Sequence, residues 1–115
     1  HGESEKLYDL AAYGAQVMAA DAARLLDHLA IGRAHVVGYS MGARIAAFLA
    51  LARPSLTATV TFGGLGINMV RGMAGTGPIA HALEAPSIED VTNPTARTFR
   101  AFAEQTKSDL KALAA

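Results

Sequence analysis

The sequence predicts a mixed α/β fold in which a parallel β-α-β unit follows one helix and precedes a helical segment. A run of β-branched residues at 35–39 leads into helix-forming residues at 41–52, and a second strand candidate follows at 58–62. Two strands separated by one helix form a parallel pair. From residue 67 onward no β-branched run appears, and glycines and prolines separate short helical stretches.

The composition excludes several function classes. The 115 residues fit one domain or part of one. Ten basic and ten acidic residues give zero formal net charge, so no basic field attracts nucleic acid or an anionic membrane. The lack of cysteine excludes disulfides, thiolate zinc sites and a cysteine nucleophile. No apolar run approaches the roughly 18 residues of a membrane span, and no signal peptide is visible, so a cytoplasmic location is the default expectation.

The remaining elements follow from start and stop signals. Asp9 is predicted to cap a helix over residues 10–29, which ends before Gly32. Apolar residues recur along it at near-helical spacing: Leu10, Tyr13, Val17, Leu25 and Leu29. Pro94 after Asn93 predicts another helix start, and Ser108 is predicted to cap a last short helix. The change in character after the second strand divides the chain into residues 1–66 and 67–115.

The motif that carries chemistry is Gly38-Tyr39-Ser40-Met41-Gly42, which matches G-x-S-x-G. In this pattern the serine lies on a strained turn between a strand and a helix, where its hydroxyl is exposed. The two glycines keep side chains out of the close approach of strand and helix. Because a strand candidate precedes the motif and a helix candidate follows it, the sequence predicts a nucleophile elbow rather than an ordinary glycine turn.

The motif in this setting resembles the α/β-hydrolase family. Residues 29–42 resemble that family's fifth strand and its elbow, and residues 58–64 resemble its sixth strand. The polar segment before residue 9 looks like the loop after the fourth strand, the helices at 10–29 and 41–52 look like helices B and C, and residues 67–115 resemble a helical cap. The resemblance therefore implies a partial α/β-hydrolase fold, with residues 1–66 as the partial core.

The resemblance also implies roles for single residues. Ser40 is the expected nucleophile, and the backbone amide of Met41 is one expected oxyanion donor. Gly38 and Gly42 shape the turn, and Tyr39 completes the elbow. A serine at this position disfavours the related enzymes that attack with an aspartate, so the expected reaction is hydrolysis of a small-molecule ester, lactone or related acyl bond through an acyl-serine intermediate, with no cofactor.

The triad is incomplete in the order that the family uses, which is serine, acid, histidine. No aspartate or glutamate lies between Ser40 and His81, the only histidine after the serine. In the family the second oxyanion donor comes from a loop after the third strand. His1-Gly2 resembles such a loop, but only one helix separates it from the elbow, which argues against this assignment. The sequence is thus expected to be an internal piece of a longer hydrolase, with negligible activity of its own.

Two function classes remain open. The first is a serine hydrolase, for which acyl transfer or a haloperoxidase-like side activity at the same elbow is a variant. The second is a relative that has lost catalysis and keeps the fold to bind a small apolar ligand or a protein partner. Turnover of an ester by the complete protein separates the two classes. Substrate identity and oligomeric state do not follow from the sequence.

Other residues invite weaker hypotheses. The apolar residues Met69, Met73, Phe99 and Phe102 are candidates for an acyl pocket, although their spacing equally suits the core of a cap. His28 and His35 are expected to be structural or solvated, and no cluster has the spacing of a metal site. The glycines at 63, 64 and 66 match neither a dinucleotide-binding pattern nor a phosphate-binding loop.

Overall fold

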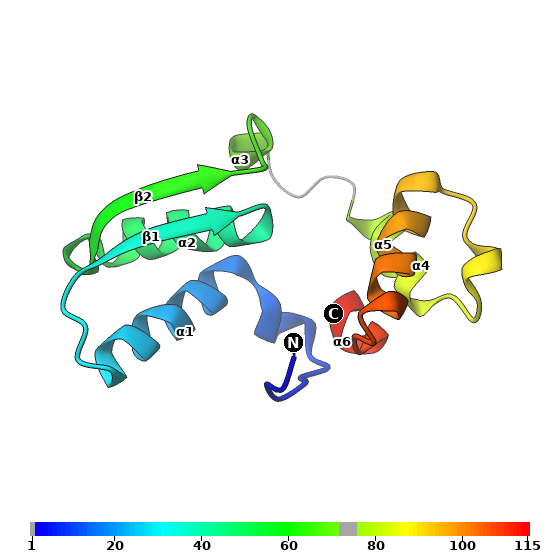
Figure 1. The fold of residues 1–115 in the computed structure, drawn as a ribbon, viewed down its shortest axis with the longest axis horizontal. Helices are drawn as coiled ribbons and strands as arrows, with labels where there is room; N and C mark the ends of the chain where they lie inside the picture. The colour runs from blue at the N-terminus through cyan, green and yellow to red at the C-terminus, as the bar shows by residue number, and fades with distance from the viewer. Residues whose placement is uncertain (1, 72–75) are drawn as a thin grey trace. The chain divides into compact units, whose positions relative to one another are not determined.

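The computed structural model describes residues 2–71 and 76–115 (Figure 1). It contains two compact units. The sheet unit is Ala11–Gly72, and the helical unit combines His1–Leu10 with Met73–Ala115. In the described part of the chain no helix has the length and apolar character needed to cross a membrane.

The sheet unit contains the predicted parallel β-α-β arrangement. Strand β1 (Ala34–Tyr39) continues through one residue into helix α2 (Met41–Ala52), and β2 (Thr57–Gly63) then pairs with β1 in parallel. The register places Tyr39 opposite Gly63. The mixed α/β class is therefore confirmed, and the elbow lies where the strand meets the helix.

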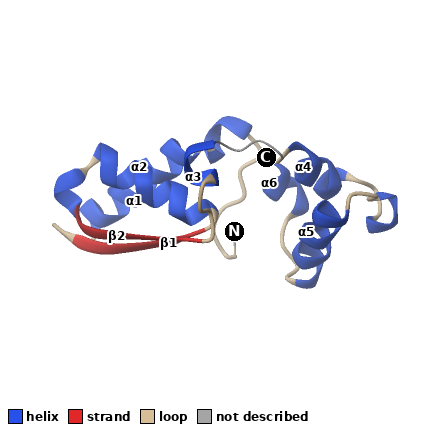
Figure 2. Cartoon of the chain, turned by 90° about the horizontal axis from the view of Figure 1, so that it is seen from above, coloured by secondary structure: helices blue, strands red, loops and turns tan. Residues whose placement is uncertain are grey.

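A small core joins α2 to helix α1 (Ala15–His28). Two alanines of α1 are buried with two leucines from α2 and the following turn: Ala19, Ala23, Leu49 and Leu56. Figure 2 shows both helices on one side of the strands. Within this unit the opposite side of β1 is open, because Val37 is 78% and Tyr39 is 76% exposed. Parallel sheets normally bury both faces, so this unit alone leaves one face uncovered.

The predicted helix over residues 10–29 is divided in the structure. A 3-10 turn, η1 (Leu10–Tyr13), is followed by Gly14 with extended dihedral angles of φ −61° and ψ 137°, and α1 begins only at Ala15. The N-cap residue of α1 is therefore Gly14. The prediction that Asp9 caps this long helix was wrong. Glycine is unfavourable inside a helix because its backbone loses the most conformational freedom there.

In the helical unit the structure confirms short helices and, among the described residues, no strand. A 3-10 turn, η3 (Ile88–Asp90), lies between the first two of its helices. The helices are α4 (Gly77–Glu84), α5 (Pro94–Gln105) and α6 (Leu110–Ala114). The Asn93 side chain accepts a hydrogen bond from the amide of Ala96 at 2.9 Å, which is the predicted cap of α5. The sheet unit itself ends with one further short helix, α3 (Asn68–Arg71).

The cap of α6 is Asp109 and not Ser108 as predicted. Its carboxylate accepts a hydrogen bond from the amide of Ala112 at 2.9 Å, and the hydroxyl of Tyr8 donates to the second carboxylate oxygen at 2.8 Å. These two hydrogen bonds, the amide first, lower the pKa of Asp109 below its usual value. A charged acceptor also interacts favourably with the helix dipole, which explains why the aspartate takes the position.

The charged residue buried in the helical unit is Arg100, which is 5% exposed. Its Nη1 atom donates to the carbonyl oxygens of Ala82, Leu83 and Ala85 at 2.8, 3.0 and 2.8 Å, and its Nε atom donates to Glu104 at 2.7 Å. The last carbonyls of a helix lack donors within the helix. The guanidinium supplies these hydrogen-bond donors and thereby joins α5 to the end of α4.

We expect Arg100→Leu to lower the free energy of unfolding by about 3 kcal/mol, because three carbonyls near the end of α4 then lose a charged donor. Chemical denaturation followed by circular dichroism measures this loss. Arg24→Gln is the matched control, since Arg24 pairs with Asp21 where both side chains are mainly exposed, and such pairs contribute less than about 1 kcal/mol. Equal effects of the two substitutions would contradict the role assigned to Arg100.

Candidate active site

Ser40 occupies the single position between β1 and α2. Its dihedral angles are φ 53° and ψ −121°, a conformation that residues with a side chain rarely adopt. Such strain costs about 1–3 kcal/mol and persists only when the surroundings fix the backbone. The residue is exposed, so the conformation places the serine at an accessible surface.

Two backbone hydrogen bonds fix this residue. The amide of Ser40 donates to the carbonyl oxygen of Gly63 at 2.8 Å, and its own carbonyl accepts from the amide of Ala43 at 3.0 Å. The first bond attaches the turn to the end of β2, and the second attaches it to the first turn of α2. The side chain makes no capping hydrogen bond to the helix, which leaves the hydroxyl for other chemistry.

The two glycines of the motif meet different surroundings. A Cβ atom at Gly38 would overlap the carbonyl oxygen of Gly42, and it would lie 2.6 Å from the carbonyl carbon of Gly42 and 2.7 Å from Cα of Ala43. A residue with a side chain does not fit there, so the close approach of strand and helix requires glycine at position 38. Apart from its chain neighbours and the nearby backbone of its own helix, a Cβ at Gly42 would meet no described atom within 4 Å.

Met41 is the first residue of α2, and its amide therefore belongs to the first turn of that helix. The amides of a first turn lack acceptors within the helix, and the helix dipole gives this end a partial positive charge. Both properties suit an amide that stabilises an oxyanion formed at the neighbouring Ser40.

The histidines of the described residues lie elsewhere in the chain than the Ser40 turn. His35 lies near the start of β1, and its Nδ1 is 2.8 Å from the hydroxyl oxygen of Thr59 on β2. His28 is the last residue of α1, and His81 lies in α4 of the helical unit. Three or more potential metal ligands do not gather anywhere in residues 2–71 and 76–115.

The acyl-pocket candidates fall in different parts of the chain. Met69 lies half-buried in α3, whereas Phe99 and Phe102 lie on α5 and are 50% and 64% exposed. Met73 is outside the described residues. An acyl pocket built from these residues stays a prediction.

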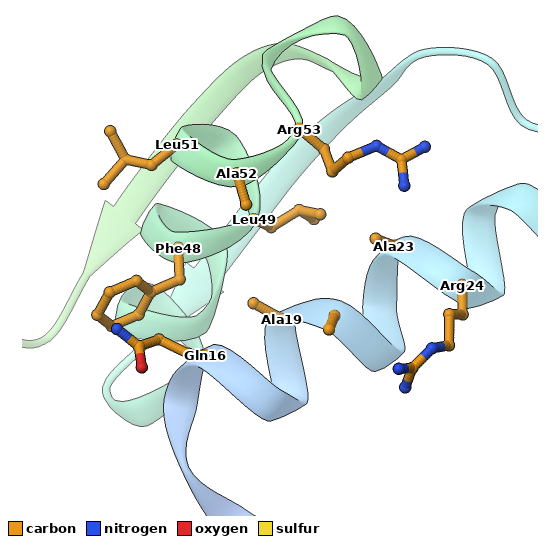
Figure 3. Close-up of a pocket in the computed structure, with 10 residues that line it drawn as sticks. Gln16, Ala19, Ala23, Arg24, Phe48, Leu49, Leu51, Ala52 and Arg53 are labelled. Carbon is orange, nitrogen blue, oxygen red and sulfur yellow. The ribbon is translucent and has the colours of Figure 1, made fainter.

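The sheet unit has a cavity of about 640 Å³ between α1 and α2 (Figure 3), and none of the elbow residues 38–42 line it. Alanines form much of its wall, and Phe48 and Leu49 of α2 line it, with Arg24 and Arg53 among its polar residues. Arg53 pairs with Asp27 through two hydrogen bonds of 3.2 and 3.0 Å. Ser40 does not line this cavity.

The loop after β2, which the G-x-S-x-G motif does not indicate, also contacts the elbow. Gly63 accepts the hydrogen bond from Ser40, and Arg44 of α2 donates from Nη2 to the carbonyl oxygen of Asn68 at 2.6 Å. These contacts fix the two ends of the loop beside the elbow. The consecutive glycines Gly63 and Gly64 at the end of a strand candidate were the signal in the sequence.

The family model described as alpha/beta hydrolase fold matches residues 1–106. No curated protein and no solved structure gives a significant match to the chain.

Gly38→Ala and Gly42→Ala are expected to change stability in opposite directions. Gly38→Ala forces strand and helix apart and lowers the free energy of unfolding by about 3 kcal/mol. Gly42→Ala places a better helix former in open space inside α2 and raises it by up to about 1 kcal/mol. Urea denaturation of both variants measures the difference, and a tolerated Gly38→Ala would refute the close approach.

Proposed function

The chain belongs to the alpha/beta hydrolase fold family, and on this premise we propose that Ser40 is the nucleophile of a serine hydrolase in the full-length protein. The proposed substrates are carboxylic esters, lactones or related acyl compounds. One observation carries the proposal: an exposed serine in a strained turn at the start of a helix, with its hydroxyl not used in capping. A serine with only a structural role can adopt an unstrained backbone conformation, whereas strained conformations cluster at functional sites.

In the proposed mechanism Oγ of Ser40 attacks the substrate carbonyl while a general base takes the hydroxyl proton. The carbonyl oxygen becomes an oxyanion beside the amide of Met41, and collapse of this intermediate expels the alcohol, which takes up the proton. Water then attacks the acyl-serine by the same route and releases the acid. The strained backbone keeps Oγ accessible without movement of the chain.

The general base and its acid are proposed to come from the remainder of the full-length protein. In the family order an acid precedes the histidine, and no acid lies between Ser40 and His81. A general base typically contributes about 10²–10⁴-fold to the rate. The 115 residues alone are therefore expected to be a very poor catalyst.

The sequence order motivates a second function, because no acid lies between Ser40 and His81 to complete a triad. A non-catalytic relative would keep the elbow and bind a small apolar ligand or a protein partner. Acyl transfer and haloperoxidase-like activity are variants of the first function, because both use the same elbow. Product analysis separates these variants from hydrolysis.

We expect a fluorophosphonate probe to label the full-length protein at Ser40, with Ser40→Ala abolishing both labelling and hydrolysis of an aryl ester. Mass spectrometry of the labelled peptide identifies the modified residue. Ser55→Ala is the control, because Ser55 is also an exposed serine but lies in a 3-10 turn, η2 (Pro54–Leu56). Labelling that persists in Ser40→Ala would contradict Ser40 as the nucleophile, whereas a full-length protein without any labelling or turnover would favour the non-catalytic function.

A further inference from the structure

The ring of Tyr39 lies against Gly63, the last residue of β2, and against Gly64, which follows it. A Cβ at Gly63 would be 3.0 Å from Cδ2 of the ring, and a Cβ at Gly64 would be 2.8 Å from both Cε2 and Cζ. The ring therefore covers the peptide that joins Gly63 to Gly64. Because Tyr39 is 76% exposed, this contact is local and is not part of a buried core.

The covered peptide is the one that bonds to Ser40. Its carbonyl oxygen, that of Gly63, accepts the hydrogen bond from the amide of Ser40 at 2.8 Å. Tyr39 precedes Ser40 in the chain and stands opposite Gly63 in the register of the sheet. The side chain of Tyr39 thus contacts the peptide group that hydrogen-bonds to Ser40, the next residue in the chain.

The strain at Ser40 makes this contact consequential. A φ of 53° persists only because the surroundings determine the backbone, and the hydrogen bond to Gly63 is one of the two bonds that do so. If the Gly63–Gly64 peptide moves, its carbonyl no longer restrains the amide, and Ser40 relaxes toward a commoner conformation. A displacement of 1 Å at a nucleophile costs up to about 10²-fold in rate.

We propose that Tyr39 is a positioning residue for Ser40: its ring restrains the Gly63–Gly64 peptide, whose carbonyl in turn restrains the nucleophile. The catalytic effect of this contact rests on the proposed function. A side chain at either glycine would crowd the ring in its present position, so the contact as it stands needs small residues there. Gly64 has a second reason in its φ of 77°.

The first test uses the full-length protein and compares Tyr39→Ala with Tyr39→Phe. The alanine variant is expected to lose between about 10- and 100-fold in kcat for an aryl ester and in the rate of phosphonate labelling, with KM little changed. The phenylalanine variant keeps the ring and is expected to retain the native rates. Native rates in Tyr39→Ala, or an equal loss in both variants, would overturn the proposal.

A double-mutant cycle tests the contact itself. Gly63→Ala is expected to slow labelling when Tyr39 is present, because the new Cβ meets the ring at 3.0 Å. Added to Tyr39→Ala it is expected to cost little further rate, since the ring is gone and the φ of Gly63 is not positive. Additive losses would show that the two residues act independently and would overturn the proposal.

Amide hydrogen exchange at Ser40 gives a readout that does not depend on activity. Tyr39→Ala is expected to accelerate exchange of this amide, whereas Tyr39→Phe is expected to leave it unchanged. If the native protein is not labelled at Ser40, the proposed function fails, while slower exchange with the ring present still supports the structural restraint. If the native protein is labelled and exchange is the same in all three proteins, the positioning role alone fails.

Discussion

The approach of Gly38 to the first turn of α2 is the contact on which the rest of the elbow depends. A strand and a helix joined by one residue bring their backbones close together, and a Cβ at position 38 would overlap the carbonyl oxygen of Gly42. Together with the two backbone hydrogen bonds of Ser40, this closeness holds that residue at a φ of 53°. The exposed hydroxyl and the adjacent helix amides follow from that one constraint.

The surrounding structure balances the strain with small, close contacts rather than with a large core. Buried alanines of α1, Ala19 and Ala23, pack against Leu49 of α2 and let the two helices lie near each other. On the other side of the elbow, the end of β2 supplies a carbonyl to Ser40 and a glycine surface to the ring of Tyr39. Proteins retain such strain mainly where function requires it, because it lowers stability.

Local patterns predicted most of the fold, and contacts between distant residues explain what they missed. The G-x-S-x-G motif between a β-branched run and a helix-forming run was sufficient to predict β1, Ser40 and α2. The spacing of apolar residues did not show that the backbone is extended at Gly14, where the predicted helix is divided. The cap of α6 is Asp109 and not the predicted Ser108. The contact of Tyr39 with Gly63 depends on strand register, which no local pattern contains. The base that would activate Ser40 is likewise not determined by this motif.

The free energy of unfolding of Ser40→Gly relative to Ser40→Ala tests the strained elbow most directly. Both variants remove the hydroxyl, but only glycine adopts a φ of 53° without strain. The account predicts that Ser40→Gly is more stable than Ser40→Ala by about 1 kcal/mol, after the greater entropy of glycine in the unfolded chain is offset. At Ser55 the same pair is expected to show the opposite order. A Ser40→Gly variant less stable than Ser40→Ala would contradict the account.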